Sequence, residues 1–237
     1  MRPPVDIADR EDYKRRMRDW LDIDPMRTVA LTVDMQREYL DASVGTSPVV
    51  PDVAASVVAA SAKLLDYCRS VGMPVVHAYV KRRRQEAEHG FFSHPYGRAS
   101  RQLRLSQNPN AEARNEVDRV EDGVAYHVPD VLLGSDDIHM TTKRPMDSFH
   151  RSDLDMILGE VLKPDTLLIM GINTDTCVYA TTFAAAHRNY QPVVISDCVG
   201  SMRGPDHHWM ALELMSRTMA WVMTYEEAIA KMNAHSS

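Results

Sequence analysis

Residues 166–197 read TLLIMGINTDTCVYATTFAAAHRNYQPVVISD. Two apolar runs in this stretch, residues 166–171 and 191–197, predict β-strands, and residues 175–189 between them predict a helix. Neither run shows the strict polar alternation of a half-exposed strand, which is typical of strands covered on both faces of a parallel sheet. The stretch therefore predicts a β-α-β unit and, with it, an α/β fold.

The same alternation continues on both sides of this unit. Four more strands are expected, at residues 28–35, 73–80, 138–142 and 220–224. Five more helices are expected, at residues 8–21, 52–71, 152–162, 205–219 and 225–234. We expect one doubly wound, Rossmann-like domain over residues 1–237, a mostly parallel six-stranded sheet with helices on both faces. In this prediction, residues 1–27 form an N-terminal helical extension.

Local signals set some of the helix ends. Asp52 is expected to cap the start of the helix over 52–71, and Gly72 to end it. Ser152 and Asp155 have capping-box spacing. Residues 81–135 show weak periodicity, and a structureless loop of that length is uncommon in a compact domain. We interpret these residues as an insertion that serves as a lid or an oligomer contact.

Composition excludes several classes of protein. The 237 residues include 27 Lys and Arg against 33 Asp and Glu, a formal net charge of -6, which argues against a nucleic-acid binder. No apolar run approaches the roughly 20 residues that span a bilayer, and residues 1–21 lack the apolar stretch of a secretory signal. The 3 Cys form no C-x-x-C pair. We expect a cytoplasmic protein with reduced thiols and neither nucleic-acid nor membrane partners.

Polar side chains follow several of the predicted strands. In an open α/β sheet, ligands bind outside the carboxyl ends of the strands, where Asp34, Lys143, Cys177 and Asp197 are expected. The thiol suits a nucleophile, the carboxylate its base, and the ammonium a partner that tunes both. Taken singly, Asp34 also suits a turn and Lys143 a solvated surface position. The combination predicts a nucleophilic site.

Cys177 has a further argument in its favour. It lies near the start of a predicted helix, whose free N–H groups and dipole favour a thiolate. The alternative is an inert, buried cysteine, which is the usual state of a free thiol. We assign that structural role to Cys68, on the apolar face of a helix, and to Cys198, directly after a strand.

Three stretches together resemble a known family. They are ALTVDMQREYLD (30–41), TKRPMDSFHRSDLDMIL (142–158) and MGINTDTCVYATTFAAAHRNYQPVVISD (170–197). In order and spacing, they resemble the isochorismatase-like cysteine hydrolase superfamily, which includes nicotinamidases and hydrolases of N-carbamoylsarcosine, ureidoacrylate and biuret. The resemblance covers nearly the whole chain after residue 27, and G-x-x-T-D-x-C-V is its most specific motif.

The resemblance implies the roles of the site residues. Cys177 would be the nucleophile, Asp34 its base and Lys143 the cation that keeps Asp34 anionic. A cis peptide bond is implied at Ile172–Asn173, with the backbone amides of Asn173 and Cys177 holding the oxyanion. The reaction so implied is hydrolysis of a small amide or ureido compound through a thioester, with ammonia or an amine as the leaving group.

The chain departs from the family in two places. The Asp-x-His metal cluster of nicotinamidases is missing from VVHAYVKRRR (75–84), so we predict no catalytic metal, no cofactor and a core role for His77. Tyr39 replaces the usual phenylalanine after the Asp motif. The candidate substrate-binding residues are Tyr39, Arg82, Arg83 and Asn173, although residues 81–84 also suit a solvated basic run.

Three functions stay open at this point. The first is the cysteine amidohydrolase, which by resemblance would be a homo-oligomer, either a dimer or a tetramer. The second is a non-catalytic or redox-responsive protein that uses Cys177 as a peroxide-sensitive thiol. The third is isochorismatase-type vinyl-ether hydrolysis, which Cys177 disfavours because the family members with that chemistry lack the nucleophilic cysteine. Residues 81–135 and the exact substrate stay unassigned.

Overall fold

The core of the molecule is one six-stranded sheet. The computed structural model describes residues 10–45, 47–88, 95–96, 98–99, 102–103, 120 and 123–235. The strands of the sheet are β1 (Thr28–Val33), β2 (Val75–Ala78), β3 (Ile138–Met140), β4 (Thr166–Ile172), β5 (Gln191–Gly200) and β6 (Trp221–Met223). Their order is β3-β2-β1-β4-β5-β6, and each neighbouring pair is parallel. The doubly wound prediction is confirmed, and the sheet is wholly rather than mostly parallel.

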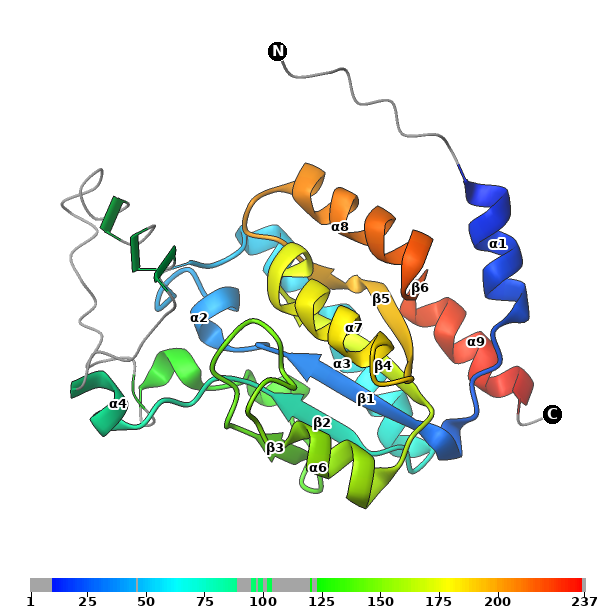
Figure 1. Cartoon of the computed structure of the whole chain (residues 1–237), viewed down its shortest axis with the longest axis horizontal. Coiled ribbons are helices and arrows are strands. Elements are labelled where there is room, and N and C mark those ends of the chain that lie inside the picture. Colours follow the sequence, from blue (N-terminus) through cyan, green and yellow to red (C-terminus); the bar gives the residue numbers. More distant parts are fainter. Residues whose placement is uncertain are drawn as a thin grey trace, which may run out of the picture.

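Helices cover both faces of this sheet (Figure 1). Helices α3 (Pro51–Ser70) and α9 (Tyr225–His235) pack on one face, with Leu64, Cys68 and Met232 in the core cluster of that side. Helices α6 (Leu154–Met156), α7 (Tyr179–Ala186) and α8 (Pro205–Thr218) pack on the other. All residues of β1 and β4 are buried, because both faces of the central strands are covered.

The predicted C-terminal end of α3 is confirmed, whereas its predicted N-terminal cap is not. At the C-terminal end, Gly72 adopts a φ of 75°, Gly72 N donates to Arg69 O at 3.0 Å, and Met73 N donates to Cys68 O at 2.9 Å. These bonds form a Schellman motif, for which glycine is best suited. At the N-terminal end, Val50 is the cap and Asp52 lies inside the first turn, so the predicted cap was wrong.

The predicted helix over 152–162 is divided into two parts. It begins as α6 and continues as a π-helix, η5 (Ile157–Leu162). Ser152 Oγ accepts a hydrogen bond from Leu154 N at 3.2 Å. Asp155 instead binds Arg188, which follows α7, with oxygen–nitrogen distances of 2.6 and 3.0 Å. The predicted capping box is therefore replaced by an ion pair between two helices.

Strand β5 is three residues longer than predicted. Asp197 and Cys198 consequently lie inside the strand rather than after it. The Asp197 carboxylate accepts a hydrogen bond from Tyr225 N at 3.0 Å, at the start of α9. The expectation that Asp197 stands at the ligand-binding edge of the sheet was wrong, because its side chain anchors a helix on one face.

The two segments predicted as extensions are described only in part. Between residues 10 and 27, the chain forms α1 (Glu11–Trp20) and the short 3-10 helix η1 (Pro25–Arg27). Between residues 81 and 135, the described elements are α4 (Arg84–Glu88) and the 3-10 helices η3 (Val124–Tyr126) and η4 (Asp130–Leu132). Most of residues 89–122 lie outside the described part. No helix among the described residues is long and apolar enough to cross a membrane.

Candidate active site

The site lies where β1 and β4 end, on the side of the sheet occupied by α2 (Arg37–Leu40) and α4 (Figure 1). Asp34 directly follows β1, is fully buried and has a φ of 52°, a conformation that a non-glycine residue seldom adopts. Asp34 N is bonded to Ala78 O at 2.9 Å. The adjacent strand approaches closely, since a Cβ at Gly171 would lie 2.0 Å from Val33 O.

Asp34 and Lys143 form a buried ion pair. Lys143 Nζ donates to Asp34 Oδ2 at 2.7 Å and to Pro145 O at 2.8 Å. Burial alone would lower the pKa of the ammonium, but the charges of Asp34 and Cys177 outweigh this effect and raise it. Asp34 Oδ1 has no hydrogen-bond partner among the described residues. One carboxylate oxygen is thus fixed by the cation, and the other is available to accept a proton.

Cys177 lies beside this ion pair. It belongs to a π-helical turn, η6 (Thr174–Val178), which leads into α7, and it is partly exposed. Burial raises the pKa of its thiol to about 12, Lys143 works to lower it, and Asp34 adds to the rise. The expectation that the helix terminus favours a thiolate was therefore wrong. Loss of solvation outweighs the effect of Lys143, so the thiol keeps its proton at neutral pH.

The backbone before Cys177 is cis at Ile172–Asn173, the pair that the resemblance implies. The Asn173 side chain is buried, and its Oδ1 accepts a hydrogen bond from Met202 N at 2.8 Å. That bond ties η6 to the loop before α8. The side-chain oxygen of Asn173, a predicted substrate-binding residue, is thus already bonded within the protein.

The other predicted substrate-binding residues separate into two groups. Tyr39 is half-buried, and loss of solvation, followed by the effects of Asp34 and Cys177, raises the pKa of its phenol while Arg82 opposes the rise. Tyr39 and Arg82 therefore belong to the surroundings of the thiol. Arg82 Nη1 also donates to Tyr126 Oη at 3.4 Å. The Arg83 side chain is exposed, and its backbone N donates to Glu86 Oε2 at 2.6 Å.

Gln36 is a residue of this region that the sequence reading missed. It is fully buried, and its Nε2 donates to Val80 O and Tyr126 O, both at 2.8 Å. Its Oε1 accepts from Val80 N at 3.3 Å. One side chain thus joins the loop after β1 to Val80, which precedes Arg82, and to Tyr126. In the sequence, only its position two residues after Asp34 could have pointed to a role for Gln36 in this region.

His77 lies within the sheet, as predicted. Its Nδ1 shares a hydrogen bond with Thr32 Oγ1 at 2.7 Å and its Nε2 with Asp137 Oδ2 at 2.9 Å. Burial lowers the pKa of this imidazole, against the opposing effect of Asp137. Among the residues that the structure describes, no three His, Cys, Asp or Glu side chains form a group that could hold a metal ion.

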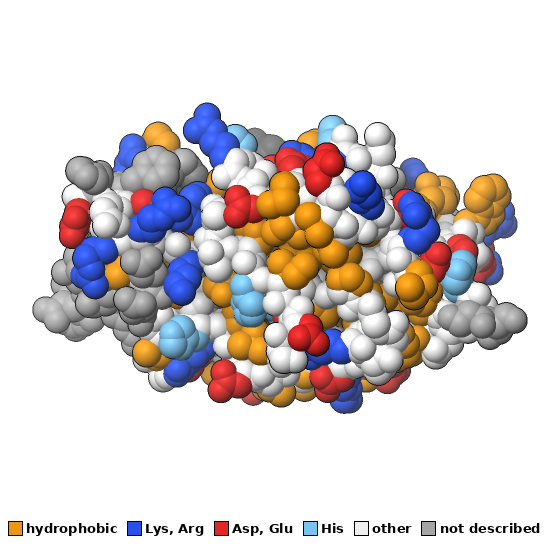
Figure 2. All heavy atoms as spheres, turned by 90° about the horizontal axis from the view of Figure 1, so that it is seen from below, with side chains coloured by type: hydrophobic (Ala, Val, Ile, Leu, Met, Phe, Trp, Pro, Cys, Tyr) orange, Lys and Arg blue, Asp and Glu red, His pale blue; other side chains and the backbone are white. Residues whose placement is uncertain are grey.

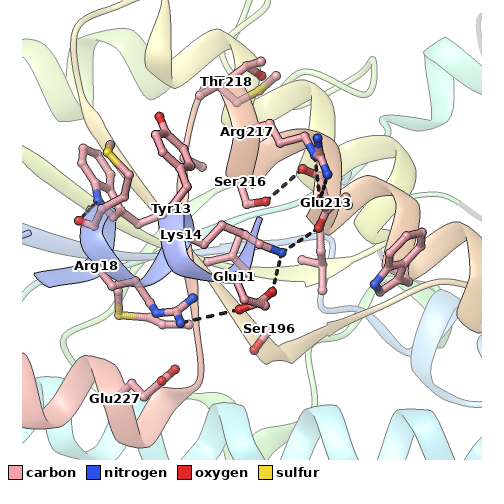
Figure 3. A pocket seen from close by; sticks show the side chains of 18 of the residues that line it. Glu11, Tyr13, Lys14, Arg18, Ser196, Glu213, Ser216, Arg217, Thr218 and Glu227 are labelled. Atoms are coloured by element: carbon pink, nitrogen blue, oxygen red, sulfur yellow. Dashed lines mark hydrogen bonds and ion pairs between the residues drawn. The ribbon is translucent and has the colours of Figure 1, made fainter. Parts of the chain in front are cut away.

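A separate cavity of about 500 Å³ lies between α1 and α8, away from the thiol (Figure 3). Lys14 of α1 points to Glu213 of α8 at 2.8 Å, and Arg217 binds the same carboxylate at 2.7 Å. The charges of Lys14, Glu213 and Arg217 therefore pair with one another within this cavity.

Apolar side chains are also exposed at the surface. Figure 2 shows hydrophobic side chains gathered near the middle of the face seen from below. The large exposed apolar residues of the molecule include Trp20, Met156, Val161, Phe183 and Trp209. Contiguous apolar patches are typical of contact surfaces between proteins. The predicted homo-oligomer stays a prediction.

Comparison with known proteins places this geometry in context. The isochorismatase domain model matches residues 28–227. The phenazine biosynthesis protein PhzD of Pseudomonas fluorescens is 25% identical over 95% of this chain and 96% of its own length. The ureidoacrylate amidohydrolase RutB of Methylobacterium radiotolerans is 27% identical over 84% of this chain and 77% of its own length. Both relatives thus match most of the chain.

Solved structures show the same fold. A cysteine hydrolase from Pseudomonas syringae pv. phaseolicola has a TM-score of 0.73 at 22% identity, covering 91% of this chain and 96% of that one. An N-carbamoylsarcosine amidase from Thermoplasma acidophilum has a TM-score of 0.63 at 22% identity, covering 84% and 97%. At such identities, the likeness concerns the fold alone.

Proposed function

The chain belongs to the isochorismatase family of hydrolases, and from this premise we propose that it is a cysteine amidohydrolase. Its reaction would be cleavage of a C–N bond in a small amide or ureido substrate. The observation that carries the proposal is the arrangement of Asp34: Lys143 Nζ holds Oδ2 at 2.7 Å, Oδ1 has no hydrogen-bond partner among the described residues, and the Cys177 thiol interacts with both side chains. A carboxylate fixed in this way suits a general base.

The reaction begins with a protonated thiol. A substrate carbonyl enters beside Cys177, Asp34 Oδ1 takes the thiol proton, and the sulfur forms a bond to the carbonyl carbon. The backbone amides of Asn173 and Cys177 stabilise the oxyanion of the tetrahedral intermediate. Asp34 then gives the proton to the leaving nitrogen, and the C–N bond breaks to release ammonia or an amine. Water, activated by the same carboxylate, hydrolyses the thioester and restores the thiol.

Lys143 supports this cycle through its charge. An ammonium 2.7 Å from Asp34 offsets the negative charge of the buried carboxylate and holds the carboxylate in place for each proton transfer. The high pKa of the thiol, about 12, fits a mechanism in which proton removal accompanies attack rather than preceding it. Tyr39 and Arg82 lie near the thiol, and we propose that they contact the substrate.

The second candidate is vinyl-ether hydrolysis. It is favoured by the name of one relative, a probable isochorismatase of Pseudomonas chlororaphis, which is 26% identical over 95% of this chain and 96% of its own length. Against it stands Cys177, a nucleophile that hydrolysis of a vinyl ether does not require. A redox-responsive thiol is the third candidate, and an intact Asp34–Lys143 pair is not needed for that role.

One experiment separates these functions. Ammonia release is measured over biuret, triuret, N-carbamoyl amino acids, ureidoacrylate, nicotinamide and simple carboxamides, with isochorismate consumption in parallel. The amidohydrolase releases ammonia from at least one compound, and Cys177→Ala and Cys177→Ser abolish this while the proteins stay folded. Cys68→Ala, which alters a core cysteine, keeps the activity. Isochorismate turnover that survives Cys177→Ala would overturn the proposal in favour of the second candidate.

We further propose a cytoplasmic homo-oligomer. The exposed apolar residues of α6, η5 and α7, including Met156, Val161 and Phe183, support a contact between copies. Light scattering of the full chain at micromolar concentration tests this proposal. A mass near 26.8 kDa would identify a monomer and contradict it.

A further inference from the structure

Arg144, the residue after Lys143, makes four hydrogen bonds. Its Nη1 donates to the carbonyl oxygens of Thr141 and Lys143 at 3.0 and 2.8 Å. Its Nε and Nη2 donate to the two carboxylate oxygens of Glu86 at 2.8 and 3.0 Å. About a fifth of each of the two side chains is exposed. Paired bonds between guanidinium and carboxylate are strong and directional, which separates this contact from ordinary surface ion pairs.

These bonds hold the backbone that carries Lys143. The loop is fixed at three carbonyls: Arg144 binds those of Thr141 and Lys143, and the Lys143 ammonium itself binds that of Pro145 at 2.8 Å. With its backbone fixed, the ammonium is directed at Asp34 Oδ2. The chain around Lys143 has no regular secondary structure that could do this instead.

Glu86 holds the guanidinium in its plane. It lies in α4, near the start of the 81–135 segment, and Arg83 N also binds its Oε2, at 2.6 Å. Burial works to raise the pKa of the Glu86 carboxyl, but the hydrogen bonds from Arg144 and from the Arg83 backbone outweigh it and lower the pKa. Glu86 is thus anionic at neutral pH and can orient Arg144.

We infer that Glu86 and Arg144 are a positioning pair for Lys143, through which α4 sets the distance between the Lys143 ammonium and the Asp34–Cys177 pair. This inference rests on the proposed function only where it gives Lys143 a part in catalysis. The positioning itself concerns three side chains of the resting protein. Neither Glu86 nor Arg144 is assigned contact with the substrate.

Displacement of Lys143 would change the reactivity of the Cys177 thiol in one direction. Lys143 works to lower the pKa of the thiol, because its positive charge favours the thiolate. A displaced ammonium does this less well, so less thiolate is present at a given pH and alkylation is slower. The same displacement moves the positive charge away from Asp34, so kcat/KM for hydrolysis falls as well.

The first test needs no substrate. The full chain is treated with iodoacetamide at pH 9, and mass spectrometry follows alkylation of Cys177 in Glu86→Gln, Arg144→Lys and the double variant. We expect each single variant to react roughly three- to tenfold more slowly than the parent, equivalent to a pKa rise of about half to one unit. The double variant should react no more slowly than the slower single one, because both changes break one contact.

Asp155→Asn is the matched control. It breaks the paired contact of Asp155 with Arg188, which has the same geometry but joins α6 to the end of α7. Alkylation of Cys177 in this variant should match the parent. If Glu86→Gln reacts like the parent while losing as much thermal stability as Asp155→Asn, the pair is merely structural and the inference is overturned.

The second test separates this inference from the proposed function. With whichever substrate releases ammonia, kcat/KM at pH 7 is expected to be lower in Glu86→Gln than in the parent, and unchanged in Asp155→Asn. Hydrolysis that survives Cys177→Ala would end the proposed function, yet the alkylation rates would still decide the positioning role. Loss of hydrolysis in Cys177→Ala together with normal alkylation in both Glu86→Gln and Arg144→Lys would end the inference alone.

Discussion

Lys143 Nζ and Asp34 Oδ2 lie 2.7 Å apart although 109 positions separate the two residues along the chain. The exposed fractions of their side chains are 2% and 0%. A buried ion pair of this kind contributes little net stability, because desolvation offsets its attraction, yet removing one partner leaves an uncompensated charge. Such a pair is better explained by a role in catalysis than by a contribution to folding stability.

Lys143→Met tests the ion pair directly. The substitution keeps an unbranched side chain, one atom shorter, but leaves the Asp34 carboxylate buried without its cation. We expect the free energy of unfolding to fall by about 3–5 kcal/mol and hydrolysis to be lost. Urea unfolding at pH 7 measures the first effect and ammonia release the second. The double variant Asp34→Asn/Lys143→Met should regain part of the stability but no activity. A double variant as unstable as Lys143→Met would contradict the role given to the charge.

The reactivity of Cys177 should depend steeply on pH. Because burial raises the pKa of its thiol to about 12, only a small fraction is ionised at pH 7. Alkylation by iodoacetamide should be on the order of a thousandfold slower than that of an exposed cysteine with an ordinary pKa. The rate should climb continuously up to pH 10. Mass spectrometry of the alkylated peptide measures this rate, and a plateau below pH 8 would show a preformed thiolate instead.

Hydrolysis should not follow the same curve. If Asp34 removes the proton during attack, turnover stays substantial near pH 7, where alkylation is slow. Parallel profiles for the two reactions would instead mean that both use the free thiolate.

His77 gives the protein a sensitivity to acid. Burial lowers the pKa of its imidazole below the ordinary 6.5, against the opposing effect of Asp137. Between these two pKa values the unfolded chain binds more protons than the folded one, so the stability that neutral His77 provides is lost as pH falls through 6.5. Urea unfolding at pH 7.5, 6.5 and 5.5 should show this fall. In His77→Gln, a smaller fall is expected from a lower starting stability, and an equal fall would place the effect elsewhere.

Gly171 should tolerate no side chain. Its φ is 135°, and a Cβ there would lie 2.0 Å from Val33 O in the neighbouring strand. Gly171→Ala is expected to cost more than about 4 kcal/mol or to prevent folding. Gly159→Ala is the control, since the nearest atom to its Cβ is Tyr190 Oη at 4.0 Å, and it should stabilise the helix by about 0.5–1 kcal/mol. Circular dichroism and thermal unfolding compare the two, and equal stabilities would contradict the steric argument.

The sequence predicted the parts of the site better than their electrostatics. Asp34, Lys143 and Cys177 could be placed at one edge of the sheet because the carboxyl ends of parallel strands meet there. The pKa of Cys177 could not be read in the same way. A helix terminus is visible in a sequence, whereas the desolvation that raises this pKa depends on atoms brought in from Asp34, Lys143 and the rest of the fold.

By itself, the amino-acid sequence determined the parallel sheet, the helices on its two faces and the end of α3 at Gly72, because periodicity and backbone preferences are local properties. Only the tertiary structure decided that Gln36 joins Val80 to Tyr126, that Arg144 reaches Glu86 in α4, and that Asp197 anchors α9 within a longer strand. Each of these depends on a polar side chain finding a partner 28 to 90 residues away. Local patterns carry no record of such distances, because packing of the whole chain sets them.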